Sequence, residues 1–211
     1  MARTVDSAHR DELLDAVARD LLRNGLVGAS LDRLATAAGT SGRMLVHHFG
    51  SSRELIGRAL ERCREQELAR ARVELPPGPD FPDVLSRAWT WFGGEEAGQF
   101  FRLFGQLAAA SRLGADRAPV SRSQLSTEWL AIVSEGFAAC GCGPAAAQRL
   151  ATVYVAQVRG LLLDLDATGD SLRIERAYQH FMSVLTRSPD LPETQPRPAR
   201  TRRPTGTAPD C

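Results

Sequence analysis

The sequence predicts an all-α protein in two helical parts. Apolar residues recur at the period of an amphipathic helix along most of the chain, as at Leu14, Val17 and Leu21. No segment alternates β-branched and polar residues, so we expect no strands. The Pro-rich stretch at 76–82 cannot be helical throughout, because proline lacks an amide donor, and we interpret it as a junction between helices.

Glycines and capping serines divide the N-terminal part into four helices. Gly25 follows the first apolar pattern, at the position where helices commonly end. Ser30 has the hydroxyl that a helix N-cap needs, and Gly50 interrupts the chain before a second capping serine. That second serine, Ser51, stands three residues before Glu54, which is the spacing of a capping box. The expected helices are 8–24, 31–38, about 41–48 and 52 to about 75.

Further helices and a tail are expected in the second part. Pro144 suits the first turn of a helix, and Pro189 stops the last helix. Residues 189–211 are rich in Pro and Arg and hold almost no large apolar side chain, so we expect a disordered tail. The expected helices are about 83–92, 95–110, 121–139, 144–166 and 171–187, and the expected domains are 1–60, 61–188 and the tail at 189–211.

Composition and charge exclude several classes of protein. No apolar run is long enough to span a bilayer, so we expect no membrane partner. The N-terminal segment is charged and lacks the pattern of a secretory signal, which predicts a cytoplasmic protein with reduced cysteines. No phosphate-binding loop or nucleophile elbow occurs, so we expect neither an enzyme nor a bound cofactor. The net charge of +1 gives no global preference for nucleic acid.

Residues 30–49 have the spacing of a helix-turn-helix motif. Leu34, Leu45 and Phe49 fall on one side and are expected to pack inward, which leaves a polar outer side. The N-terminus of the second helix presents free amide groups that attract phosphate, and serine and threonine hydroxyls bond to phosphate oxygens. An arginine side chain can bond to guanine through two atoms. The outer residues that we expect to contact DNA are Thr40, Ser41, Gly42, Arg43, Met44, His47 and His48.

Other interpretations of these outer residues stay open. Arg43 would also suit a helix surface that only faces water. His47 and His48 are metal-ligand types, but adjacent residues lie about 100° apart around a helix and do not easily chelate one ion, so we expect no metal site. Residues 1–60 hold eight arginines and seven acidic residues, a net charge of +1 that is small for a DNA-binding surface unless a dimer doubles it.

The sequence AAGTSGRMLVHHFGSSREL at residues 37–55 resembles the N-terminal pattern of the tetracycline-repressor (TetR) family. That pattern is Ala-Ala-Gly-Val-Ser-x-x-x-Leu-Tyr-x-His-Phe-Gly-Ser-Lys-x-Glu-Leu, and the resemblance covers about residues 8–60. Thr40, Val46 and Ser52 stand where the family has Val, Tyr and Lys, and the last two departures remove phosphate contacts. Arg53 follows the missing lysine and can replace it. The resemblance extends the expected DNA contacts to Ser30, Ser52 and Arg53.

The same resemblance implies a sequence-specific transcriptional regulator with a second domain that binds a small molecule and forms a homodimer. We expect a repressor that binds a palindromic DNA operator and is released by its effector. The composition permits these roles, although an ordinary packed core would explain the same aromatic residues. Candidate pocket residues are Trp89, Phe92, Phe101, Arg102, Phe104, Gln106, Trp129, Tyr154 and Gln157. Candidate dimer residues are Val153, Leu161, Leu162, Ile174, Phe181 and Leu185, on two helices that are apolar over much of their circumference.

Two cysteines in the sequence Cys-Gly-Cys, Cys140 and Cys142, leave a different form of regulation open. Together with Cys63 they are too few for a closed zinc site, but thiols at this spacing could respond to oxidation. The alternatives to a ligand-gated repressor are therefore a redox-responsive regulator and an architectural DNA-binding protein without a small-molecule ligand.

Overall fold

All regular secondary structure in the described part of the chain is helical, as the sequence predicts. The computed structural model describes residues 2–112 and 122–192, with side chains described over 8–107 and 127–192. No helix within these ranges is long and apolar enough to cross a membrane. The helices are α1 (Ala2–Asn24), α2 (Leu31–Ala37), α3 (Gly42–Phe49), α4 (Ser52–Glu74), α5 (Phe81–Arg87), α6 (Trp89–Phe92), α7 (Glu95–Arg112), α8 (Arg122–Ala139), α9 (Pro144–Thr168) and α10 (Ser171–Leu185).

One expected helix is divided in two. Residues 83–92 belong to α5 and α6, because the amide of Ala88 bonds to the carbonyl of Leu85, three residues back, at 3.0 Å. An uninterrupted α-helix would use the carbonyl four residues back, so this tighter turn ends α5. The other helices lie where the periodicity places them, although α1 begins earlier than expected. The expected capping pair Ser121 and Gln124 lies outside the residues whose side chains are described.

The segment after α10 lies against the helices as far as the described chain extends. Leu191 packs on the core of the second part. Asp190 accepts two hydrogen bonds from Arg149 of α9, at 2.6 and 3.1 Å. The sequence assigned residues 189–192 to a disordered tail because they are Pro-rich and polar, whereas the structure places them on the surface of the second part. The remainder of that expected tail, 193–211, lies outside the described residues.

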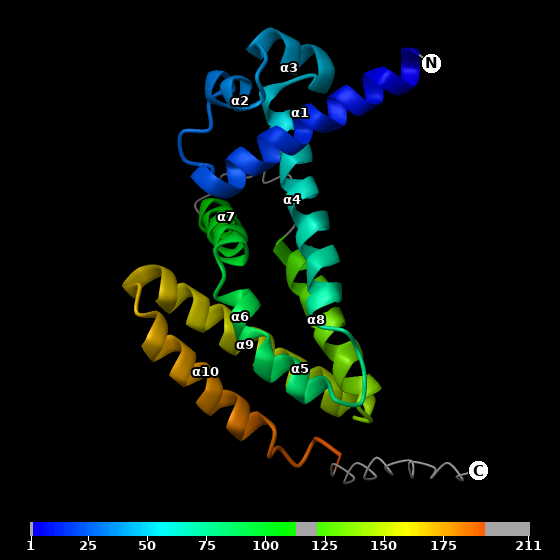
Figure 1. The fold of residues 1–211 in the computed structure, drawn as a ribbon, viewed down its shortest axis with the longest axis vertical. Helices are drawn as coiled ribbons and strands as arrows, with labels where there is room; N and C mark the ends of the chain where they lie inside the picture. The colour runs from blue at the N-terminus through cyan, green and yellow to red at the C-terminus, as the bar shows by residue number, and fades with distance from the viewer. Residues whose placement is uncertain (1, 113–121, 193–211) are drawn as a thin grey trace, which may run out of the picture.

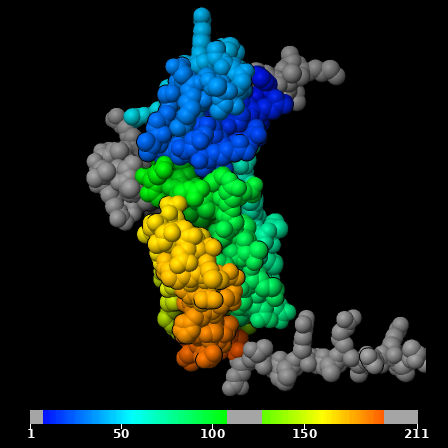
Figure 2. Space-filling view, turned by 60° about the vertical axis from the view of Figure 1, so that its left-hand side comes forward, coloured from blue at the N-terminus to red at the C-terminus, as the bar shows by residue number. Residues whose placement is uncertain are grey.

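Two hydrophobic clusters divide the fold, and α4 contributes to both (Figure 1). The first cluster contains the inward faces of α1, α2, α3 and the first half of α4. The second cluster begins at Leu68 of α4 and continues through α5, α6, α8, α9 and α10. The space-filling view in Figure 2 likewise shows the N-terminal helices at one end and α9 and α10 toward the other. The boundary expected between residues 60 and 61 therefore falls inside one continuous helix.

α7 also connects the second part to the N-terminal helices. Its residues Leu103 and Leu107 are buried in the first cluster. The side-chain oxygen of Gln106 accepts a hydrogen bond from the amide of Leu26, just after α1, at 2.9 Å. Gly25 has φ of +72°, and a Cβ at this position would lie 2.7 Å from the same oxygen. Glycine is thus needed both for the left-handed turn and for the approach of Gln106.

Candidate functional site

Helices α2 and α3 form a helix-turn-helix unit with a well-defined turn. Gly39 has φ of +64°, a left-handed conformation that glycine adopts without strain. The amide of Thr40 then bonds to the carbonyl of Ala35 at 3.0 Å and closes the end of α2. The hydroxyl of Ser41 accepts a hydrogen bond from the amide of Met44 at 3.3 Å, which caps the start of α3. This turn is therefore held by backbone and capping bonds that leave the outer side of α3 free.

Two large side chains hold α3 against its neighbours. Leu45 and Phe49 are buried, and the guanidinium of Arg10 on α1 lies 5.5 Å from the centre of the Phe49 ring. Gly42 lies close to α2, since a Cβ on it would be 3.1 Å from the side chain of Leu31. Its small size therefore serves the contact between the two helices, whereas the sequence suggested a close approach to DNA.

The end of α3 is fixed to the start of α4. Gly50 has φ of +87°, and a Cβ there would overlap the carboxylate of Glu54. Ser51 caps α4 by accepting a hydrogen bond from the Glu54 amide at 3.2 Å, and its own hydroxyl donates to the Glu54 carboxylate at 3.0 Å. The position of α3 is thus coupled to the axis of α4, the helix that continues into the second part.

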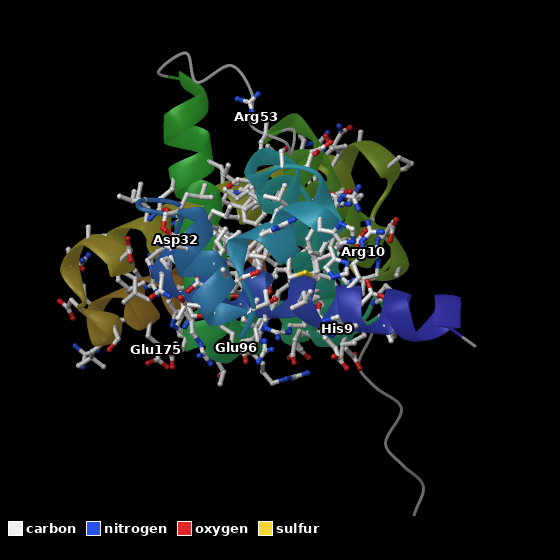
Figure 3. All side chains as sticks on the ribbon, turned by 90° about the horizontal axis from the view of Figure 1, so that it is seen from above. His9, Arg10, Asp32, Arg53, Glu96 and Glu175 are labelled. Atoms are coloured by element: carbon white, nitrogen blue, oxygen red, sulfur yellow. The ribbon has the colours of Figure 1, made fainter. Side chains whose placement is uncertain are left out.

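The outer side of α3 is exposed. Arg43 and His47 face solvent, Met44 is 41% exposed, and the Arg43 guanidinium has no hydrogen bond or ion pair among the described residues. Arg53, in the first turn of α4, points away from the surrounding helices in the view of Figure 3. The remaining predicted contacts lie around the same end of the molecule, with Ser30 and Ser41 exposed and with Thr40, Gly42, His48 and Ser52 half-buried.

The two histidines of α3 have different surroundings. His48 lies edge-on to the ring of His9 on α1 at 6.0 Å and to the ring of Phe49 at 6.4 Å. His47 is the more exposed of the pair. No group of three or more possible ligands that could hold a metal ion occurs among the described residues. His48 therefore belongs mainly to the packing of α3 on α1, and His47 to the outer surface.

An arginine that sequence analysis did not select holds α2 in place. Arg33 bonds to the carboxylate of Asp20 on α1 at 3.0 Å and to the carbonyls of Gly25 and Val27 at 2.8 and 3.1 Å. These partners lie in the turn between the first two helices, so the side chain fixes that turn. The positive charge left for a ligand of the outer face is therefore concentrated on Arg43 and Arg53. No periodic pattern in the sequence distinguishes Arg33 from those two.

Aromatic rings from three helices meet inside the second part. Trp129 of α8 lies 5.8 Å from Trp91, 6.0 Å from Phe92 and 5.9 Å from Phe101, measured between ring centres. Phe92 also lies 6.4 Å from Tyr154 of α9. We call Trp91, Phe92, Phe101 and Trp129 the aromatic cluster. It is formed where α6, α7 and α8 come together.

Comparison with known proteins gives similarity in structure. No protein-family model matches the sequence, and no curated protein matches it. The fold is similar to that of a TetR-family transcriptional regulator from Rhodococcus sp., with a TM-score of 0.63 and 19% identity over 84% of this chain and 98% of that chain. A transcriptional regulator from Rhodococcus sp. Rha1 is 25% identical, with a TM-score of 0.62, over 83% of this chain and 92% of that chain. The multidrug binding protein EbrR, in complex with imidazole, is 24% identical, with a TM-score of 0.57, over 83% and 88%.

The chain has the fold of the TetR-family transcriptional regulators. The similarity extends well past the N-terminal motif, because it covers more than four fifths of the chain. The helix-turn-helix of residues 31–49 is therefore joined to the helical second part that such regulators have. Regulators with this fold are DNA-binding proteins and not enzymes.

The TetR-like second part separates the candidate pocket residues into distinct places. Phe92, Phe101 and Trp129 belong to the aromatic cluster, and Trp89 and Tyr154 are buried beside it. Arg102 forms an exposed ion pair with Asp166 at 3.3 Å, and Gln157 is exposed. Phe104 and Gln106 lie at the contact between α7 and the N-terminal helices. The nine residues thus do not line one common space.

The candidate dimer residues are also in different environments. Ile174, Leu161, Leu162 and Leu185 are buried within their own chain, whereas Val153 is 53% exposed and Phe181 half-buried. The structure exposes three apolar side chains on α9 and α10 that the sequence did not select as dimer residues, and these are Leu163, Leu172 and Val184. Periodicity shows that both helices are apolar over much of their circumference, but it does not tell which side meets the same chain.

Proposed function

We propose that this protein is a sequence-specific DNA-binding transcriptional regulator, acting as a repressor that a small-molecule effector releases from its operator. The observation that carries the proposal is the outer side of α3. Arg43 and Met44 are exposed there on a short helix whose inner side is fixed by Leu45 and Phe49. Similarity of the whole fold to transcriptional regulators supports the same function.

In this mechanism α3 lies in the major groove of double-stranded DNA. The Arg43 guanidinium would bond to the O6 and N7 atoms of guanine, and Met44 would contact a thymine methyl group. The capped N-terminus of α3 and Arg53 would meet the phosphates on either side. Because the N-terminal part carries little net charge, a pair of such helices is needed for tight binding.

A two-fold homodimer would supply that pair. The exposed apolar side chains of α9 and α10, including Val153, Leu163 and Val184, form the surface that a second copy of the chain would cover. The two copies of α3 would then meet successive major grooves about 34–36 Å apart on a palindromic operator. An effector that favours another spacing of the two helices weakens operator binding, and such coupling is typically about 1–3 kcal/mol. α4 and α7 would transmit the change, since both contact the N-terminal helices.

The test of the proposal is selection of bound duplexes from a random double-stranded DNA library at physiological salt. We expect enrichment of a two-fold symmetric motif whose half-sites are about one helical turn apart. Light scattering of the free protein at micromolar concentration should give the mass of two chains. Enrichment of no motif, or a stable monomer with an asymmetric site, would show that the helix-turn-helix does not act as proposed.

A second candidate, a redox-responsive regulator, is favoured by the geometry of the Cys140 and Cys142 pair. The two sulfur atoms lie 3.8 Å apart in the turn between α8 and α9. Gly141 between them has φ of +101°, which brings the two side chains to the same side of the turn. Burial raises the pKa of Cys142 to about 12, whereas Cys140 is partly exposed. Cys140 is thus the thiol that a peroxide would reach first.

Mild hydrogen peroxide is expected to join these two residues in one disulfide. The Cys140 thiolate attacks one peroxide oxygen and releases hydroxide, and Cys142 then displaces water from the resulting sulfenic acid. One peroxide is reduced to two waters for each pair of thiols oxidised. Cys63 should stay reduced, because burial raises its pKa to about 12 as well. Peptide mass spectrometry measures all three sites.

The regulatory consequence is tested on DNA. A redox-responsive regulator loses operator affinity on oxidation and regains it with dithiothreitol, and the Cys140→Ser variant is unresponsive. Disulfide formation without any change in affinity would remove this second candidate.

A further inference from the structure

Three buried polar atoms in the second part lack a partner. Oε1 of Glu67, Oε2 of Glu128 and Nε1 of Trp129 have no hydrogen bond among the described residues. Glu67 is 3% exposed and Trp129 is 4% exposed, so water in bulk does not satisfy them. Folded proteins leave few buried polar groups unsatisfied, because each such group costs about 1–3 kcal/mol. Three unsatisfied atoms on two adjoining helices call for a common explanation.

The three atoms lie where α4 meets α8. Arg64 of α4 donates to the Glu128 carboxylate of α8 at 2.5 Å and also pairs with Glu61. Glu67 follows Arg64 by three residues, which places both on the same side of α4. Trp129 follows Glu128 directly on α8 and is part of the aromatic cluster. The acidic and aromatic groups therefore come together at one level of the second part, beside the first turns of α7.

The acidic groups here outnumber the basic ones. Arg64 is shared between Glu61 and Glu128, and Arg70 forms an ion pair with Glu96 of α7 at 2.6 Å. Neither arginine is bonded to Glu67. When all four carboxylates are ionised, the two arginines leave this cluster with a deficit of positive charge. The missing partner is therefore a cation or a strong hydrogen-bond donor.

The aromatic cluster adds a second requirement. The rings of Trp91, Phe92, Phe101 and Trp129 surround one another at 5.8–6.4 Å between the centres given above. Aromatic faces attract cations and stack with other planar rings. The indole nitrogen of Trp129 is a donor only, so it needs an acceptor atom. A planar aromatic molecule that carries one positive charge and one acceptor would satisfy all of these groups.

We infer that the effector of this protein is a planar aromatic cation, held between Glu67 of α4 and the aromatic cluster around Trp129. This inference rests on the proposed function for the effector's role, but binding itself does not depend on DNA. Glu67 lies on the helix whose first turn is bonded to the end of α3 through Ser51 and Glu54. An effector that pulls on Glu67 therefore acts on the element that positions α3.

Protonation of Glu67 gives the site a predictable pH dependence. Burial raises the pKa of Glu67 to about 7, with Arg70 lowering this pKa and Glu96 raising it. The charged groups that face it are thus Arg70 on α4 and Glu96 on α7, while the nearby Glu128 on α8 is occupied by Arg64. Only ionised Glu67 pairs with a cation. Cation binding should therefore be about tenfold tighter at pH 8 than at pH 6, because the ionised fraction rises about tenfold across a pKa of 7.

The test uses two probes of nearly identical shape on the full chain without DNA. 1-Methylquinolinium is a planar cation, and 1-methylnaphthalene is its neutral counterpart. Titration followed by tryptophan fluorescence at pH 8 should show the cation binding at least tenfold more tightly than the neutral ring. The Glu67→Gln variant should lose at least tenfold in affinity for the cation and should lose the pH dependence. The Glu65→Gln variant is the matched control, since Glu65 is exposed on the same helix.

Equal affinity for the two probes, no binding of the cation, or cation binding that Glu67→Gln leaves unchanged would each overturn the inference. Circular dichroism of both variants establishes that they are folded. A protein that selects a palindromic DNA motif but fails this titration keeps the proposed function and loses only the inferred effector class. A protein that binds the cation but selects no DNA motif loses the proposed function and keeps the binding site.

Discussion

The Phe49→Ala variant is expected to lose about 3–5 kcal/mol of unfolding free energy, and specific DNA binding with it. Phe49 is 2% exposed at the end of α3, and its ring is covered by Arg10 of α1. Removing the ring leaves a cavity and also frees the guanidinium that lies over it. Because α3 is only eight residues long, its position depends on this packing and not on helix propensity. Urea denaturation and fluorescence anisotropy with labelled operator measure the two losses.

Val46→Ala is the matched control for this prediction. Val46 is 38% exposed on the same helix, so its truncation removes little buried surface. Its unfolding free energy should stay within about 0.5 kcal/mol of the wild-type value. Wild-type DNA affinity in Phe49→Ala, together with a clear loss of stability, would mean that the position of α3 is set by something other than its buried side.

The second large effect concerns Glu67 and the stability of the free protein. Burial raises the pKa of Glu67 from 4.5 to about 7, so the folded state holds its proton over a range in which the unfolded state has lost it. The resulting stabilisation is fully present below pH 4.5 and is lost as the pH rises through 7. Its full size corresponds to about 3 kcal/mol, at about 1.4 kcal/mol for each pH unit.

Glu67→Gln should therefore match the wild type in unfolding free energy near pH 4 and exceed it by up to about 3 kcal/mol at pH 8. Glutamine keeps the size of the side chain and cannot ionise. Denaturant titrations at both pH values measure the difference, with Glu65→Gln as the exposed control. Identical pH dependence in the wild type and Glu67→Gln would show that Glu67 is not a buried ionisable group. In the wild type, a bound cation at pH 8 should recover the lost stability, which links this result to the inferred effector.

The N-terminal part could be predicted from the sequence because its determinants are local. Ser41, Gly39 and the Ser51–Glu54 pair act within a few residues of their own positions, and the structure forms all of these turns and caps. Leu45 and Phe49 follow from helix periodicity. The outer residues follow by elimination once the buried side is known, although the use of Gly42 against Leu31 does not, since it depends on a neighbouring helix.

The second part was harder to predict because its sites depend on contacts between distant helices. Gln106 and Phe104 were grouped with the aromatic residues by sequence proximity, but α7 extends far enough to place them against α1. Glu67 sits in a highly charged stretch that resembles a solvated helix face. Its burial arises only when α7 and α8 pack on α4, so no pattern within the stretch distinguishes it from the exposed Glu65.

The most direct measurement of the central claim compares Arg43→Ala and Arg53→Ala in the selection from random DNA. Both side chains are exposed and basic, but only Arg43 is placed to contact a base. We expect Arg43→Ala to lose preference at one base pair of each half-site, a change of about 1–3 kcal/mol, while Arg53→Ala weakens binding evenly across sequences. An unchanged motif in Arg43→Ala, or an equal and sequence-independent loss in both variants, would contradict the account of α3 as the helix that recognises DNA sequence.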